Sequence, residues 1–164
     1  METSEHRAQA TRPVSGGARS ADRLDRVRDL PPHGYGAVVT DPSTAGFAAV
    51  LGVRDRAAQD GTARLRLDAT EDHLNEAGTV HGGVLATLVD MAMGQAVRSS
   101  TGDSDVPATS QLTVTYLRPG KPGTVEVRAR VSKQGENLTV CEADVEQDGR
   151  PLAHALATFA VLHR

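Results

Sequence analysis

The sequence has few aromatic residues, one cysteine and no basic segment. Aromatic residues make up 2% of the 164 residues, so a single-stranded nucleic acid would find almost no stacking platform. The net charge of −3, without a block of Lys and Arg, argues against binding to a phosphate backbone. A lone cysteine, Cys141, cannot form an intrachain disulfide, and its apolar neighbours at two-residue spacing favour a buried thiol.

Long hydrophobic runs are also missing. No segment matches a signal peptide or a membrane-spanning helix, which favours a cytoplasmic protein without a membrane partner. Residues 1–40 are rich in Arg, Ser, Ala and Gly, and we predict a poorly ordered polar extension there, because such a segment buries too little surface. Residues 1–30 are expected to be dispensable for catalysis. Residues 41–164 are predicted to form one globular domain.

Alternation of apolar and polar residues predicts six strands in this domain. They cover residues 53–56, 62–67, 110–117, 124–132, 138–146 and 151–162, with a turn at 57–61. In the third strand, one face is predicted to carry Leu112, Val114 and Tyr116, and the other Thr113 and Thr115. A short helix is predicted from 41 to about 51. Consecutive hairpins indicate an antiparallel sheet.

One long helix is predicted over residues 84–98. Its apolar stripe consists of Leu85, Leu88, Ala92 and Ala96. The opposite face is small and nearly uncharged, with Thr87 and Gly94 on either side of one acid, Asp90. Because this helix is the only element able to cover the apolar face of the sheet, the sequence predicts an α+β fold with a long helix on an antiparallel sheet.

The residues His81-Gly82-Gly83 precede this helix. The first turn of a helix has unpaired N–H groups at its positive end, and glycines let another group approach them closely. Oxyanion holes are built in this way, so a donor here and an acid two turns later are consistent with acyl transfer. The alternative is that the glycines only allow tight packing and that Asp90 is a solvated acid.

The residues from His73 to Gly83 follow the pattern H-x-N-x-x-G-x-x-H-G-G, and Asp90 lies eight residues after Gly82. This combination resembles the motif of the hotdog-fold acyl-CoA thioesterases of the phenylacetic-acid-degradation (PaaI) type. The resemblance extends over about residues 47–162, because three further motifs match: G-T-A-R-L from Gly61, T-Y-L-R-P from Thr115 and D-G-R from Asp148. It implies the hotdog fold, in which a curved antiparallel sheet wraps one central helix.

The resemblance also implies an activity, the hydrolysis of aryl- or medium-chain acyl-CoA thioesters to the free acid and CoA. It assigns Asp90 as nucleophile or general base, the Gly82 N–H as oxyanion donor, and Thr109 as a hydroxyl that acts in the partner's site. The substrate-binding residues that it implies are Asn75, His81, Gly83 and Thr87. Asn75 and His81 also fit purely structural roles, in a turn and in the loop before the helix.

The assembly implied by the resemblance is a homodimer or homotetramer with a continuous sheet and active sites between subunits. Neither a cofactor nor a metal is expected, because His81 lacks the neighbours of a metal site. Two alternatives remain open: a non-catalytic acyl-CoA-binding hotdog module, and a hotdog dehydratase. The dehydratase requires a His acting with the helix acid, whereas the predicted helix body offers only Asp90.

Overall fold

The computed structural model describes residues 46–101 and 105–162. The polar extension predicted for residues 1–40 and the first residues of the predicted short helix lie outside this range. The described chain runs through α2 (Phe47–Val50), β1 (Val53–Gln59), β2 (Thr62–Ala69), the 3-10 helix η1 (Glu71–His73), α3 (Gly82–Arg98), β3 (Val106–Tyr116), β4 (Gly123–Gln134), β5 (Leu138–Gln147) and β6 (Arg150–Leu162).

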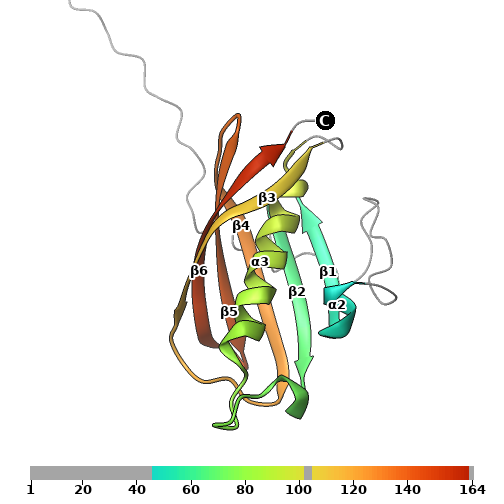
Figure 1. The fold of residues 1–164 in the computed structure, drawn as a ribbon, viewed down its shortest axis with the longest axis vertical. Helices are drawn as coiled ribbons and strands as arrows, with labels where there is room; N and C mark the ends of the chain where they lie inside the picture. Colours follow the sequence, from blue (N-terminus) through green and yellow to red (C-terminus); the bar gives the residue numbers. More distant parts are fainter. Residues whose placement is uncertain (1–45, 102–104, 163–164) are drawn as a thin grey trace, which may run out of the picture.

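The strands form one six-stranded sheet in the order β1-β2-β4-β5-β6-β3. Every neighbouring pair is antiparallel. The chain leaves β2 at one side of the sheet, passes through α3 and enters β3 at the far edge. β1 and β3 are therefore the two edges of the sheet, and β3 lies along the helix (Figure 1).

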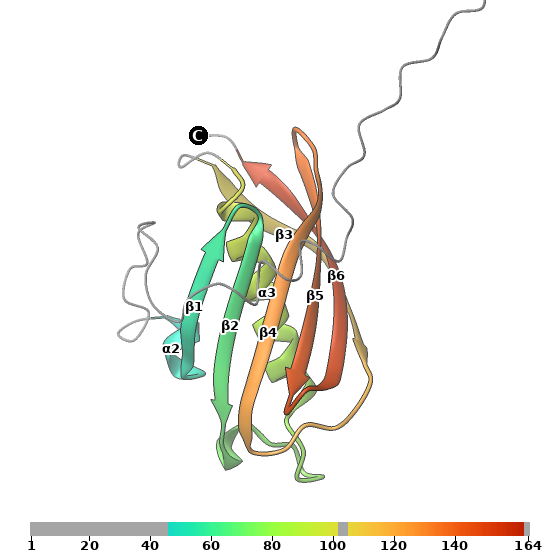
Figure 2. The ribbon, with the colours of Figure 1, turned by 180° about the vertical axis from the view of Figure 1, so that it is seen from behind.

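The long helix α3 lies in the hollow of the curved sheet. Figure 1 shows it in front of β2, β4 and β5, and Figure 2 shows the same strands covering it from behind. The predicted stripe is buried, and Val89, Met93 and Val97 join it in the core. From the sheet, alternate residues of β2, β4, β5 and β6 face the helix, for example Leu65, Val127, Cys141 and Phe159. The predicted α+β hotdog architecture is confirmed.

Several predicted element boundaries are wrong by a few residues. β1 continues through residues assigned to a turn, because a bulge with Asp55 in a left-handed conformation (φ 46°) interrupts its pattern. The turn itself is confined to Asp60 and Gly61. The long helix begins at Gly82 rather than two residues later. β3 begins at Val106, so Thr109 lies inside the strand and not just before it.

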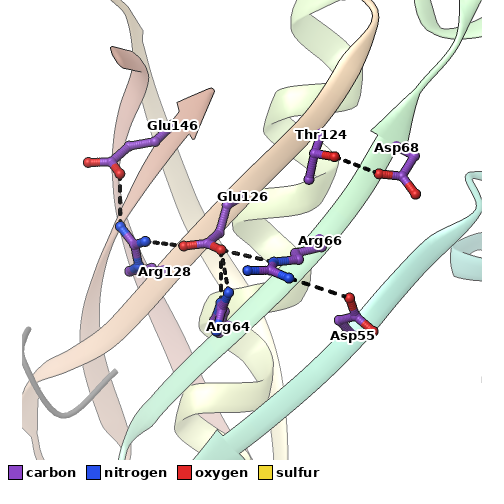
Figure 3. A network of polar contacts seen from close by, with 8 residues as sticks. All are labelled: Asp55, Arg64, Arg66, Asp68, Thr124, Glu126, Arg128 and Glu146. Carbon is purple, nitrogen blue, oxygen red and sulfur yellow. Dashed lines mark hydrogen bonds and ion pairs between the residues drawn. The ribbon is translucent and has the colours of Figure 1, made fainter. Parts of the chain in front are cut away.

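The outer face of the sheet carries a network of charged side chains (Figure 3). Glu126 of β4 accepts hydrogen bonds from Arg64 at 2.6 Å and Arg66 at 3.0 Å, both on β2, and also pairs with Arg128. The side chains of Arg64 and Glu126 are only 14% exposed, although they point away from the helix. Charge pairing across strands therefore stabilises the β2–β4 contact on the face opposite the core.

Candidate active site

The N-terminus of α3 is capped by an unusual residue, His81. Its ring Nδ1 accepts a hydrogen bond from the Gly83 N–H at 2.8 Å. An accepting Nδ1 carries no proton, so in the neutral ring the proton sits on Nε2. The imidazole is exposed, and its Nε2–H is a second donor at the helix start. The bond also explains why Gly83 is glycine, since a Cβ there would lie 2.9 Å from Nδ1.

Gly82 is the first residue of the helix. The carbonyl of His81 accepts from the N–H groups of Val84 and Leu85, and Gly83 donates to the His81 ring. Within residues 46–101 and 105–162, no acceptor takes the N–H of Gly82. This N–H is the donor that the sequence singles out for an oxyanion, and the local bonds leave it unused.

Tyr116, the last residue of β3, contacts the same turn. Its hydroxyl donates a hydrogen bond to the carbonyl of Gly82 at 3.0 Å. The ring lies so close that a Cβ on Gly82 would be 3.2 Å from it. Sequence analysis assigns Tyr116 no role, although alternation with Leu112 and Val114 already places it on the correct face of the strand.

Asn75 lies in the turn that leads into the site. Its Oδ1 accepts from the N–H groups of Ala77 at 3.0 Å and Thr79 at 3.2 Å, and its Nδ2 donates to the Thr79 hydroxyl. His73 is likewise tied to the backbone, with Nε2 3.0 Å from the Leu51 carbonyl oxygen. These bonds give Asn75 a structural role in the loop before α3. Its contact with substrate stays a prediction.

Asp90 lies two turns into α3, half-buried on the face toward β3. The hydroxyl of Thr109 donates to Asp90 Oδ1 at 2.7 Å, and both residues belong to the same chain. Thr109 therefore holds the carboxylate of its own chain, and the role in the partner's site that the resemblance implies stays a prediction. Among the described residues, the other oxygen of Asp90 accepts no hydrogen bond.

A β-bulge aims Thr109 at the helix. The β3–β6 register shifts between Thr109 and Gln111, so Ser110 is an extra residue whose hydroxyl bonds the Thr158 carbonyl. Without it, strict alternation would put Thr109 on the face of Thr113, away from the helix. Bulges are frequent beside active sites because they redirect a side chain in this way.

Thr87 uses its hydroxyl within the helix. It donates to the carbonyl of Gly83, four residues earlier, at 2.9 Å. This is a common arrangement for a helical threonine, and it leaves Thr87 only its methyl group and the two lone pairs of its hydroxyl oxygen for a ligand. The substrate-binding roles of Thr87 and Gly83 stay predictions, since both are engaged at the helix start.

The two reactive groups of one chain lie far apart. Gly82 and Asp90 are separated by eight residues of helix, which corresponds to about 12 Å along the axis. An attacking group must lie about 3 Å from the carbonyl carbon whose oxygen the donor binds. One thioester therefore cannot contact the Gly82 N–H and the Asp90 carboxylate of the same chain.

Other reactive groups lie away from this face. Burial raises the pKa of the Cys141 thiol to about 12, with the charge of Glu142 adding to the effect, so this thiol is unreactive in the folded protein. Within residues 46–101 and 105–162, no cluster of three or more His, Cys, Asp or Glu could hold a metal ion. None of the helices in this part of the chain has the length and apolar character needed to cross a membrane.

A helix wrapped by a curved antiparallel sheet, with a glycine turn at its start and an acid on its edge-facing side, defines a hotdog domain of the thioesterase type. Residues 77–154 match the family model described as Thioesterase superfamily. The matched range includes the glycine turn, Asp90, Thr109 and Tyr116.

Three relatives support the same family. A Caenorhabditis elegans protein named "Putative esterase" is 41% identical over 93 residues, which cover 55% of this chain and 54% of that protein. A Halobacterium salinarum protein of the same name is 40% identical, covering 61% and 69%. Human acyl-coenzyme A thioesterase 13 is 33% identical, covering 60% and 71%. The chain thus spans about half of the worm protein and more than two thirds of the other two.

Solved structures share the architecture. A conserved protein of Pseudomonas aeruginosa matches with a TM-score of 0.72 and 32% identity, over 76% of this chain and all of that one. The E. coli PaaI protein from the phenylacetic acid degradation operon matches at 0.67 and 27%, over 73% and 86%. A Streptococcus pneumoniae hypothetical thioesterase with coenzyme A matches at 0.60 and 29%, over 65% and 85%. The chain belongs to the thioesterase superfamily and is a thioesterase.

Proposed function

We propose that the protein hydrolyses acyl-CoA thioesters at a site formed by two copies of the chain. The hydrogen bond from Thr109 to Asp90 carries this proposal, because it holds a carboxylate on an open, small-residue face beside the sheet edge. The names of two similar proteins, a human acyl-coenzyme A thioesterase and a streptococcal thioesterase with coenzyme A, support CoA as the leaving group. Aryl or medium-chain acyl groups are the proposed substrates.

The proposed dimer brings reactive groups of two chains together. Pairing of two β3 edges would continue the sheet and run the two α3 helices antiparallel, so that the start of one helix faces the middle of the other. Gly82 of one chain then approaches the partner subunit's Asp90, which removes the separation of about 12 Å within one helix. A dimer of dimers is the proposed larger assembly.

The chemistry follows from these groups. The thioester carbonyl oxygen gains negative charge when the carbon is attacked, and the Gly82 N–H stabilises that charge. Asp90 attacks directly, forming an anhydride that water then hydrolyses, or it removes a proton from the water that attacks. In either route the C–S bond breaks, the acid is released, and the CoA thiolate takes up a proton.

Mixed dimers test the proposal. Asp90→Asn removes the reactive carboxylate. Gly82→Pro removes the N–H at the first helical position, where proline is well tolerated and where His81 already has the extended conformation (ψ 133°) that proline requires. Gly82→Ala is the matched control, since it adds the same Cβ near Tyr116 but keeps the N–H.

Each of the two variants should be nearly inactive on a panel of acyl-CoAs, while Gly82→Ala retains most activity. After the two inactive variants are co-refolded, half of the dimers are mixed and hold one intact site, so about a quarter of wild-type activity should return. No recovery would show that the groups do not meet across an interface. Binding of acyl-CoA by the wild-type protein without turnover would favour the non-catalytic module instead.

A further inference from the structure

The peptide group between Gly82 and Gly83 is held at both ends. Its carbonyl, on Gly82, accepts from the Tyr116 hydroxyl at 3.0 Å, and its N–H, on Gly83, donates to His81 Nδ1 at 2.8 Å. A peptide group is planar and rigid, so two bonds at opposite ends fix its rotation. This group adjoins the peptide that carries the unused N–H of Gly82.

Burial within its own chain does not explain the position of Tyr116. It is 52% exposed, at the end of the edge strand β3, and its hydroxyl makes no other hydrogen bond among the described residues. Glycine has no Cβ to restrict its backbone, so two glycines in succession make the first turn of α3 easier to deform than a turn of other residues. The bond from Tyr116 adds a restraint from outside the helix and also ties this turn to the strand that carries Thr109.

We propose that Tyr116 is a positioning residue for catalysis: its hydroxyl fixes the Gly82–Gly83 peptide and so aims the Gly82 N–H at the developing oxyanion. The inference rests on the proposed function of Gly82. A preorganised donor is worth more than a mobile one because no reorganisation is needed during the reaction. Residues of β3 thereby orient both reactive groups: Thr109 orients the Asp90 carboxylate, and Tyr116 orients the Gly82 N–H.

Tyr116→Phe tests the inference, since it removes only the hydroxyl. We expect kcat to fall roughly tenfold with KM changed less than about twofold, because the donor acts in the transition state and not in substrate binding. Thr124→Val removes an exposed hydroxyl that bonds Asp68, on β4, which β5 and β6 separate from β3. It is the matched control and should leave kcat unchanged. Equal loss in both variants, or a change confined to KM, would overturn the inference.

A double mutant separates positioning from direct contact. In the Gly82→Pro background the donor is absent, so adding Tyr116→Phe should lower kcat by no more than about twofold further. A full tenfold loss in that background would show that Tyr116 acts on the substrate and not through Gly82.

Hydrogen exchange gives a readout that does not depend on turnover. The Gly83 amide, measured by NMR, should exchange several-fold faster in Tyr116→Phe than in wild type, and at the wild-type rate in Thr124→Val. Unchanged Gly83 exchange would overturn the inference even if the enzyme is active. An inactive wild-type protein in which Gly83 exchange still responds would count against the proposed activity and leave the restraint by Tyr116 intact.

Discussion

The two edges of the sheet differ in charge. β1 has three charged residues in succession, Arg54, Asp55 and Arg56, and a bulge at which Asp55 takes a left-handed conformation. β3 has eleven residues and no charged side chain. Both strands contain a bulge, so the difference between them is charge. Charged side chains protect an edge from pairing with another chain, whereas a long uncharged edge invites it. The edge that is open to pairing is also the edge that holds Asp90 and Gly82.

This difference explains where the site can form. A pocket between chains needs an edge that pairs and reactive groups that lie beside it. On β3 both conditions hold, because Thr109 and Tyr116 contact α3 at two levels of the same strand. On β1 neither holds. Changes near β3 are therefore expected to lower activity, and changes elsewhere are not.

The largest effect is expected at Asp90. Asp90→Asn keeps the shape of the side chain but removes its charge and its capacity as base or nucleophile, so kcat should fall by on the order of 10³ or more. Asp55→Asn on the β1 edge is the matched control. Asparagine tolerates the left-handed conformation of that position, and the exposed contact with Arg66 at 3.8 Å contributes little.

Initial rates at saturating acyl-CoA check this pair. Asp55→Asn should stay within about twofold of wild type, since nothing reactive lies at that edge. Similar losses at both positions would mean that the acid acts through stability and not through chemistry.

The next effect concerns the pairing itself. Tyr116 lies level with Gly82 and Thr109 with Asp90, so the proposed site needs Tyr116 opposite the partner subunit's Thr109. Because Ser110 is an extra residue in β3, the two-fold axis then falls at position 113, and Thr113 lies opposite its own copy. Thr113→Glu places two carboxylates together there and should weaken the dimer on the order of 100-fold.

Sedimentation velocity and specific activity over a dilution series measure this effect. For Thr113→Glu, the sedimentation coefficient and the specific activity should fall together at concentrations where the wild-type protein is dimeric and active. Arg54→Glu, on the edge that already carries charge, should change neither. A Thr113→Glu protein that remained a fully active dimer would place the interface elsewhere.

A smaller effect is expected at Thr109. Thr109→Ala removes the hydrogen bond that orients Asp90 while leaving the carboxylate, so kcat should fall roughly tenfold. Thr109→Ser retains the hydroxyl and should restore most of the rate. If alanine and serine behaved alike, the bond would have no part in the reaction.

The sequence predicts the regular parts of this fold well and the irregular parts poorly. Helix and strand faces follow from spacing, so the buried stripe of α3 and the inward residues of β4 and β5 agree with the structure. The bulge at Ser110 shifts the alternation of β3, so that residues before it point to the face opposite the one that strict alternation predicts. Nothing in the local sequence marks this bulge. The direction of the Thr109 side chain depends on that bulge, so residue spacing alone could not predict that it faces the helix.

The contacts of the site depend on distant partners. Asp90 and Gly82 stand out in the sequence because an acid and paired glycines are conspicuous on an apolar helix. Tyr116 does not, since its role comes from a hydrogen bond to a residue 34 positions away. Only the crossing of the chain from α3 to the far edge of the sheet brings these residues together.

The smallest effect on activity is expected at Glu126, far from β3 (Figure 3). This carboxylate bonds two arginines of β2 and pairs with Arg128, and it is only 14% exposed. Glu126→Gln leaves three guanidinium groups with a neutral partner and should lower the free energy of unfolding by about 2 kcal/mol. Glu146→Gln, whose carboxylate pairs with one arginine and is 35% exposed, should cost less than about 0.5 kcal/mol. Urea unfolding measures both, and kcat of the folded variants should match wild type, because this network stabilises β2 and β4 without touching the edge where the site lies.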